Sequence, residues 1–181
     1  MPRLTQRLGL TRYEADEYYK EALRAYDNDD MNAAVLAMES AIDMLPTNSE
    51  YYAARGLFYL LDGEIDAASA DFEESLRHYP YEVLAHYGLG VIAYDKRDME
   101  TALEQFTIAQ RADPQRPETL YYLALVQHHR GENAVALDLM QQAHALFDQA
   151  GDSKNRTTAN RWIATLKRLA NESNQPRLPG N

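Results

Sequence analysis

The sequence predicts an all-α fold made of four repeated helical hairpins and one further helix. Three prolines, Pro46, Pro80 and Pro114, follow one another at intervals of 34 residues. Apolar residues recur at the same interval, and each set of residues spaced in this way is called a column of the repeat. Several columns in one register rarely arise by chance. Neither an alternation of apolar and polar residues nor a β-branched run favours strands, so helices are the expected elements.

The repeating columns supply what paired helices require. Small residues allow two helix backbones to approach closely, and they form the columns Ala34, Ala68, Ala102, Ala136 and Ala22, Gly56, Gly90, Ala124. Bulky residues fill the space between hairpins, in the column Met38, Phe72, Phe106, Met140. The prolines fall where the second helix of a hairpin has ended. Polar, turn-forming stretches at 27–30, 62–64, 95–98 and 130–132 separate the two helices of each hairpin.

This pattern of bulky, small and proline positions resembles the tetratricopeptide repeat (TPR) family across residues 15–148. The resemblance implies a right-handed α-solenoid of four helix-turn-helix units at 15–48, 49–82, 83–116 and 117–150, preceded by an N-terminal arm at 1–14. The fourth unit has Asp148 in place of the closing proline, as expected where an array ends.

Residues 151–172 are expected to form a helix that caps the array, because the last apolar face of a stack must be covered. Apolar residues recur there at helical spacing: Ala159, Trp162, Ile163, Leu166 and Leu169. Basic residues fill the remaining surface: Lys154, Arg156, Arg161, Lys167 and Arg168. Trp162 is expected to pack on the fourth unit, and a dimerisation helix is the alternative. Residues 173–181 are expected to be a disordered tail.

Two charged residues depart from the family pattern. Glu21 and Arg55 occupy a column in which the family prefers leucine and in which Leu89 and Leu123 stand in this chain. We expect Glu21 and Arg55 to pair with each other across the boundary between the first two units, because pairing lowers the cost of charge at a semi-buried position.

The net charge of −10 is distributed unevenly along the chain. Residues 13–150 contain 26 acidic and 9 basic residues, whereas residues 1–12 and 151–181 are net basic. Such a field disfavours nucleic acid and attracts basic partners, although simple solubility is an alternative explanation. No apolar run is long enough for a signal peptide or a transmembrane segment, so a cytoplasmic location is expected.

The predicted binding face lies on the first helix of each unit, which the family resemblance places on the concave side. Three columns spaced four and three residues apart share one helical face. They predict a tyrosine-rich groove of Tyr19, Leu23, Tyr26, Leu57, Leu60, Tyr87, Val91, Tyr94, Tyr121, Leu125 and His128. An acidic rim is expected at Asp16, Asp27, Glu50, Asp95 and Glu118. The alternative is that the apolar members of the groove, above all the column of Leu23, Leu57, Val91 and Leu125, are core.

The expected ligand is a protein or peptide segment with apolar anchors and flanking Lys or Arg residues. Family members that bind the acidic carboxyl-terminal tail of a chaperone present lysine, arginine and asparagine in the groove, and that set is missing here. Residues 1–12 themselves combine Arg3, Arg7 and Arg12 with three leucines, so this arm could occupy a groove of its own or of a neighbouring copy.

Catalytic and cofactor chemistry finds no support in the sequence. The chain has no cysteine, which excludes disulfides, thiolate zinc sites and cysteine nucleophiles. No glycine-rich phosphate loop occurs, and His128 and His129 are adjacent without a third metal ligand on their face. We therefore expect no catalytic residue, no metal and no cofactor, and a non-enzymatic adaptor or assembly scaffold. The alternative is a self-associating scaffold, a homo-oligomer whose basic termini dock on the acidic body of a neighbouring copy.

Overall fold

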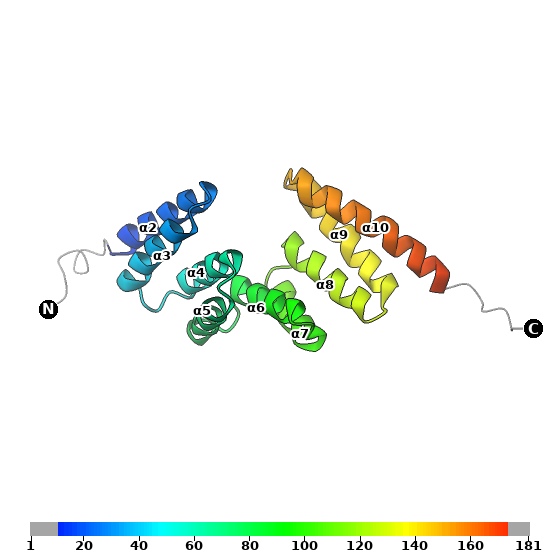
Figure 1. Cartoon of the computed structure of the whole chain (residues 1–181), viewed down its shortest axis with the longest axis horizontal. Coiled ribbons are helices and arrows are strands. Elements are labelled where there is room, and N and C mark those ends of the chain that lie inside the picture. Colours follow the sequence, from blue (N-terminus) through cyan, green and yellow to red (C-terminus); the bar gives the residue numbers. More distant parts are fainter. Residues whose placement is uncertain (1–10, 174–181) are drawn as a thin grey trace, which may run out of the picture. The chain divides into compact units, whose positions relative to one another are not determined.

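A computed structural model describes the backbone of residues 11–173 and the side chains of residues 11–169, and every regular element in that part of the chain is an α-helix (Figure 1). The helices are α2 (Thr11–Asp27), α3 (Met31–Met44), α4 (Ser49–Asp62), α5 (Ile65–His78), α6 (Val83–Asp95), α7 (Met99–Ala112), α8 (Pro117–His129), α9 (Asn133–Gln149) and α10 (Ser153–Ser173). The chain divides into two compact units, Met1–Ile92 and Ala93–Asn181. Most of the expected arm and tail lies outside the described residues.

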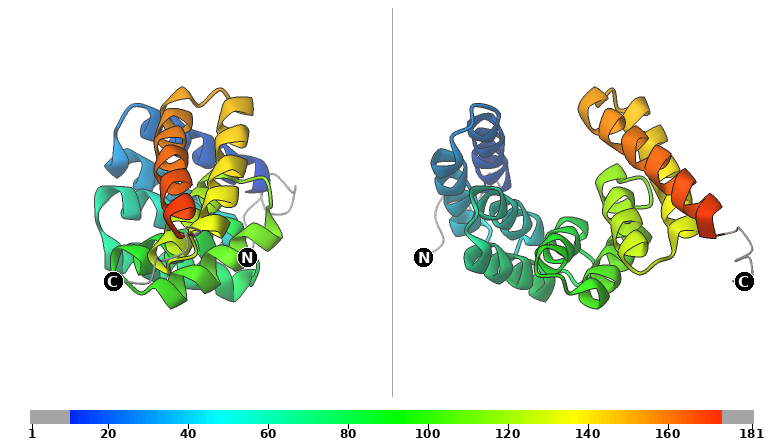
Figure 2. Two further views of the ribbon diagram at one scale, coloured as in Figure 1. Left: turned by 90° about the vertical axis from the view of Figure 1, so that its right-hand side faces the viewer. Right: turned by 45° about the vertical axis from the view of Figure 1, so that its right-hand side comes forward.

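Consecutive helices pair as hairpins within each unit. The first unit contains the pairs α2/α3 and α4/α5, and α3 also packs on α4. The second unit contains α7, which packs on α8, followed by the pair α8/α9 and by α10, which packs on α9. In both views of Figure 2 the blue helices α2 and α3 lie side by side. The all-α class of repeated hairpins is therefore confirmed.

The turns inside the hairpins share one backbone feature. Residues at positions 29, 63, 97 and 131, which are 34 residues apart, all adopt a positive φ between 62° and 86°. Glycine occupies two of these positions, where the left-handed conformation costs little, while Asp29 and Arg97 occupy the others. In these two turns the next residue, Asp30 or Asp98, caps the following helix by accepting a backbone hydrogen bond from Ala33 or Thr101. Two of the turns therefore use a glycine at the left-handed position, and the other two use a non-glycine residue there followed by an aspartate cap.

The repeating columns form the core. The alanines of one small column, Ala34, Ala68, Ala102 and Ala136, have no exposed surface. The same holds for the bulky column, Met38, Phe72, Phe106 and Met140. Burial of this kind stabilises the fold by about 25 cal/mol per Å² of apolar surface. The periodicity in the sequence thus corresponds to the buried positions of each hairpin.

Gly56 and Gly88 pack against the same aromatic ring. A β-carbon on Gly56 would lie 2.9 Å from two ring carbons of Phe72, and one on Gly88 would overlap the far end of that ring. The absence of side chains therefore lets Phe72 lie completely buried against both α4 and α6. The close approach predicted at Gly56 is confirmed, and Gly88 plays the same role.

Helix α10 covers the fourth hairpin. Its residues Ala159, Ile163 and Leu166 are buried in one cluster with Met140 and Phe147 of α9. The Trp162 ring makes an edge contact with His128 of α8, with 5.5 Å between ring centroids. The prediction that Trp162 packs on the fourth unit is confirmed.

The predicted pairing of Glu21 with Arg55 is wrong. Arg55 on α4 instead donates two hydrogen bonds, each 2.7 Å long, to Asp71 on α5 of the same hairpin. Glu21 is exposed on α2. A carboxylate on the paired helix is the nearer partner, because residues of one hairpin face each other directly.

Candidate binding surface

Aromatic rings join the first helices of the first unit. Tyr19 on α2 packs against Tyr51 on α4, and Tyr26 stacks on Phe58, with 5.7 Å between the ring centroids in each pair. Phe58 is buried, whereas Tyr26 remains 41% exposed. Leu23, which lies between the two tyrosines on α2, is 42% exposed. The predicted face of α2 therefore offers apolar surface above a fixed aromatic layer.

Hydrogen bonds to acidic side chains orient this layer. The buried Tyr51 hydroxyl donates to Asp16 Oδ1 at 2.8 Å. Burial raises the pKa of Tyr51, and the bond to Asp16 raises it further. Burial likewise raises the pKa of Tyr19, followed by the effect of Glu50. Both phenols therefore stay neutral and act as hydrogen-bond donors at physiological pH.

The remaining predicted groove residues of the first unit are less accessible than Leu23 and Tyr26 of α2. Leu57 and Leu60 of α4 are half-buried beside the cluster around Phe72. Tyr87 on α6 is also half-buried. Val91 is only 7% exposed and belongs to the core. These four residues are covered by neighbouring helices to a greater extent than Leu23 and Tyr26, although three of them share the columns of those two residues.

In the second unit the predicted tyrosines form part of an aromatic cluster. Tyr94 and Tyr121 each make an edge contact with Tyr122, and Tyr122 stacks on the buried ring of Phe106. The Tyr94 hydroxyl also lies 3.2 Å from His129 Nε2. Burial raises the pKa values of Tyr94 and Tyr122. The cluster holds the half-buried Tyr94 and Tyr121 in fixed positions.

His128 and Leu125 complete the predicted set in the second unit. His128 Nδ1 lies 2.7 Å from Asn133 Oδ1, so this half-buried ring is bonded at the turn of its own hairpin. Leu125 is 6% exposed and lies in the core cluster of α8, α9 and α10. Val91 and Leu125 are therefore corrected from groove to core, because they present almost no side-chain surface to a ligand.

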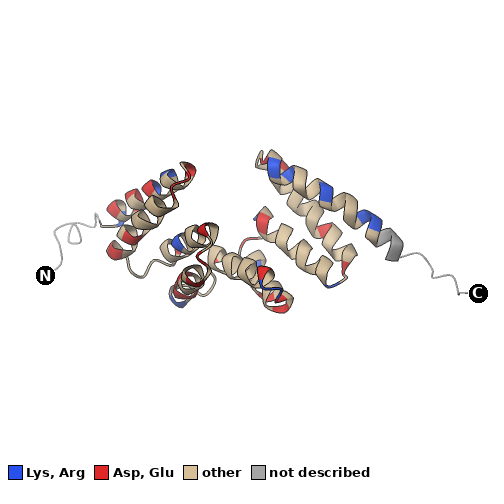
Figure 3. Cartoon of the chain, viewed as in Figure 1, with Lys and Arg blue, Asp and Glu red and all other residues tan. Residues whose placement is uncertain are grey.

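The predicted acidic rim is partly engaged within the chain. Asp27, Glu50 and Asp95 are exposed, whereas Asp16 bonds Tyr51 and Glu118 lies 3.7 Å from the guanidinium of Arg116. Figure 3 shows acidic residues on helices throughout the two units, while basic residues gather on α10. Three of the five rim residues are thus exposed and make no ion pair among residues 11–169.

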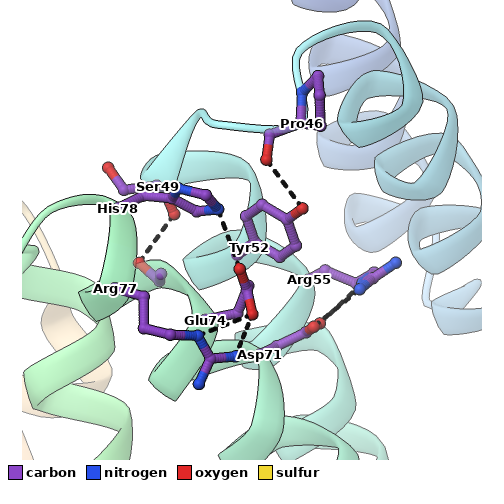
Figure 4. Close-up of polar contacts among 9 residues, drawn as sticks. Pro46, Ser49, Tyr52, Arg55, Asp71, Glu74, Arg77 and His78 are labelled. Atoms are coloured by element: carbon purple, nitrogen blue, oxygen red, sulfur yellow. Dashed lines mark hydrogen bonds and ion pairs between the residues drawn. The ribbon is translucent and has the colours of Figure 1, made fainter.

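A second polar cluster lies between α4 and α5 (Figure 4). The Arg55 guanidinium, bonded to Asp71, lies 5.9 Å from the ring centroids of both Tyr52 and Tyr59. The Tyr52 ring stacks on His78, and its hydroxyl donates to the carbonyl of Pro46 at 3.0 Å. The cluster joins the two helices and the preceding loop, so it serves the packing of this hairpin.

Sequence reasoning missed the residues that support the tyrosines. Phe58 and Tyr122 lie one position, and Tyr51 lies two positions, away from the predicted columns, so the column pattern alone passes over them. Residue type was the available signal, because each is a large aromatic on a first helix. Within residues 11–169 no group of three potential ligands could hold a metal ion, and no described helix is long and apolar enough to cross a membrane.

Comparison with known proteins identifies the repeats. The model of the Tetratricopeptide repeat family matches residues 19–82, 62–117 and 87–151. The chain belongs to the tetratricopeptide repeat family. The matched segments span all four hairpins of this TPR protein, which agrees with the columns found in the sequence.

Two named TPR proteins illustrate which sequences this chain resembles. The Photosystem I assembly protein Ycf3 of Rippkaea orientalis is 29% identical over 122 residues, which cover 61% of this chain and 69% of the relative. The human protein SGT1 homolog is 27% identical over 99 residues, covering 55% of this chain and 27% of the relative.

Solved structures show the same fold. The APC/C hetero-tetramer Cut9-Hcn1 matches with a TM-score of 0.74 and 21% identity, covering 84% of this chain and 29% of that chain. The first TPR of Spaghetti (RPAP3), bound to the HSP90 peptide SRMEEVD, matches with a TM-score of 0.62 and 13% identity, covering 66% of this chain and 98% of that chain. At such identities the similarity concerns the fold alone.

Proposed function

We propose that this TPR protein is a non-catalytic adaptor or assembly factor that binds an apolar and basic polypeptide segment on the tyrosine-bearing faces of its first helices. TPR proteins mediate protein–protein interaction and assembly, and the Ycf3 relatives are Photosystem I assembly proteins. The observation that carries the proposal is the exposed pair Leu23 and Tyr26, which lies on α2 above buried aromatic rings and beside the exposed Asp27.

The chemistry of this surface favours one class of ligand. Partly exposed tyrosine rings are common at binding hot spots because they are rigid, largely apolar and carry a polar tip. Exposed carboxylates at Asp27, Glu50 and Asp95 attract Lys and Arg side chains and repel acidic peptides. The acidic body disfavours nucleic acid. A cytoplasmic site of action and the absence of a cofactor belong to the same proposal.

A matched pair of leucine variants tests the proposed face. Leu23 on α2 and Leu36 on α3 are both exposed, at 42% and 62%, on the two helices of one hairpin. We expect Leu23→Ser to weaken binding of a fluorescent peptide made of leucine and arginine residues, and Leu36→Ser to leave it unchanged. Fluorescence anisotropy measures this, with a wild-type Kd on the order of micromolar. Equal effects of the two substitutions would reject the first-helix face.

A capture experiment with the natural partner tests the wider face. Wild type and a Tyr87→Ala, Tyr121→Ala double variant are used as baits against the same extract. We expect the double variant to lose the partner that wild type captures. Equal capture by both baits would show that these two tyrosines do not contribute to binding.

Self-association is the second candidate function. The apolar face of α10 packs on α9, and its basic side chains are exposed. These basic residues are Lys154, Arg156, Arg161, Lys167 and Arg168. Such a face is complementary to the acidic body of another copy. Light scattering, which measures the mass of the particle in solution, tests self-association. A mass that falls when salt is added, when residues 1–12 are deleted, or when Arg161→Glu and Lys167→Glu are combined would favour self-association. A constant monomer mass would exclude it.

A further inference from the structure

A shallow pocket lies beside the turn of the first hairpin. It encloses about 440 Å³ and is lined by Tyr26, Asp27, Asp29, Met31 and Leu61. Leu61 of α4 is 51% exposed and Tyr26 is 41% exposed. The lining therefore combines apolar side chains with the aspartates, and it lies at the end of the proposed α2 binding face.

The two carboxylates of the pocket have no partner within the described part of the chain. Asp30, their neighbour in the turn, accepts a hydrogen bond from the Ala33 backbone and so caps α3. Asp27 and Asp29 take part in no side-chain hydrogen bond or ion pair among residues 11–169, and both are exposed. The pocket thus combines apolar walls with two uncompensated negative charges.

The repeat provides an internal comparison. Two repeats further along, the five positions of the pocket are occupied by Tyr94, Asp95, Arg97, Met99 and His129. Three positions keep their residue type, whereas Asp29 is replaced by Arg97 and Leu61 by His129. His129 Nε2 lies 3.2 Å from the Tyr94 hydroxyl, and the charge of Arg97 offsets part of the rise in the pKa of Tyr94 that burial causes.

In the second unit, then, the chain supplies basic groups of its own at these positions. In the first unit the corresponding positions carry an acid and an exposed leucine. We propose that the pocket of Tyr26, Asp27, Asp29, Met31 and Leu61 binds an arginine side chain of the partner segment. This inference rests on the proposed function, and it assigns one subsite of the ligand.

Arginine fits this chemistry better than other side chains. Its three methylene groups can cover Leu61 and Met31 while the guanidinium reaches Asp27 and Asp29. The planar guanidinium also stacks on aromatic rings such as Tyr26 and bonds carboxylates through two nitrogens at once, which a lysine ammonium does not do. Lysine should therefore bind more weakly than arginine in the same sequence.

A double-mutant cycle with a synthetic peptide tests the pocket. The probe is the fluorescent leucine and arginine peptide, together with versions in which each arginine in turn is replaced by neutral, isosteric citrulline or by lysine. We expect an Asp27→Asn, Asp29→Asn variant to bind the arginine peptide about fivefold more weakly at low salt, because two exposed ion pairs are lost. One citrulline peptide should bind wild type and this variant alike, and its lysine counterpart should bind wild type with intermediate affinity.

Matched variants keep the result specific. Asp66→Asn with Glu73→Gln removes the same charge from exposed positions of α5, and it should leave affinity unchanged. Asp29→Arg with Leu61→His copies the residues of the second unit, and it should abolish the preference for arginine over citrulline. Thermal melting checks that each variant is folded.

The outcomes separate this inference from the proposed function. Equal binding by the Asp27→Asn, Asp29→Asn variant and the α5 control would overturn the arginine pocket. If Leu23→Ser still weakened binding in that case, the first-helix face would stand without it. Failure of wild type to bind the arginine peptide would overturn both proposals.

Discussion

Arg55 on α4 binds Asp71 on α5 through two parallel hydrogen bonds, each 2.7 Å between nitrogen and oxygen. The side chain of Asp71 is 9% exposed and that of Arg55 is 19% exposed. The bond to Asp71 raises the pKa of Arg55, so the guanidinium stays charged at physiological pH. The second hairpin therefore contains a nearly buried ion pair at two positions where the third and fourth hairpins place apolar or neutral residues.

Removing one member of this pair should destabilise the hairpin. Arg55→Leu installs the residue that Leu89 and Leu123 show in the same column, but it leaves the Asp71 carboxylate without its cation. We expect the free energy of unfolding to fall by about 3 kcal/mol, because an unpaired charge at a nearly buried site is costly. Chemical denaturation followed by circular dichroism measures the change.

The control is the double variant Arg55→Leu, Asp71→Leu. Leu139 occupies the column of Asp71 in the fourth hairpin, so the double change copies residues that the repeat accepts elsewhere. We expect it to recover most of the lost stability, since apolar residues often replace buried ion pairs at little cost. A double variant as unstable as Arg55→Leu would show that the leucines do not pack in this hairpin.

The structure shows which part of the fold the sequence could predict. Columns such as Ala34 and Met38 are determined by packing that repeats at every hairpin, so spacing alone located the core. The partner of Arg55 was not predictable in this way, because Ala37, Gln105 and Leu139 share the column of Asp71 and no repeated rule links the two positions.

The exposure of the residues on the proposed binding face could be predicted only in part, for a similar reason. Spacing places Val91 and Leu125 on the same helical face as Leu23, yet the first two are core and Leu23 is exposed. A column identifies a direction from the helix axis, whereas exposure depends on what each neighbouring helix covers. The pocket at Leu61 escaped prediction because it depends on a turn and on the next hairpin together.

Gly88 should not tolerate a side chain. A β-carbon there would overlap the ring of Phe72, which is completely buried and also confined by Gly56. We expect Gly88→Ala to destabilise the protein by about 1–3 kcal/mol, the usual cost of overpacking, despite the better helix propensity of alanine. Thermal unfolding measures this. Adding Phe72→Leu to Gly88→Ala should restore part of the loss, and no restoration would contradict the proposed clash.

The cap of α7 should make stability depend on pH. Hydrogen bonds from Thr101 lower the pKa of Asp98, so its ionised form is favoured in the folded state. The stabilisation is present above the unfolded pKa of about 4 and is lost as the pH falls through the folded pKa. Asp98→Ala should lower Tm at pH 7, and Asp98→Asn, which keeps a cap that cannot titrate, should lose less Tm than wild type on acidification.

Glu132 provides the comparison for this cap. It stands at the corresponding position before α9 but makes no capping hydrogen bond through its side chain. Glu132→Ala should therefore leave Tm at pH 7 nearly unchanged. A fall in Tm equal to that of Asp98→Ala would show that the Thr101 bonds are not what stabilises the helix end.

Selectivity between peptides of opposite charge should distinguish this protein from the RPAP3 domain that shares its fold. That domain is bound to SRMEEVD, a peptide with three acidic residues. Here the exposed Asp27, Glu50 and Asp95 would repel such a ligand. We expect no binding of SRMEEVD at concentrations that saturate the leucine and arginine peptide, as measured by fluorescence anisotropy of the two peptides under identical conditions.

Salt identifies the physical origin of that selectivity. Raising ionic strength shortens the Debye length from about 10 Å at 0.1 M to about 3 Å at 1 M, so attraction between exposed charges weakens. Binding of the leucine and arginine peptide should decline with salt but persist in part, because contacts with Leu23 and Tyr26 are apolar. Binding that disappears completely would assign the interaction to charge alone, and binding that is insensitive to salt would remove the acidic residues from recognition.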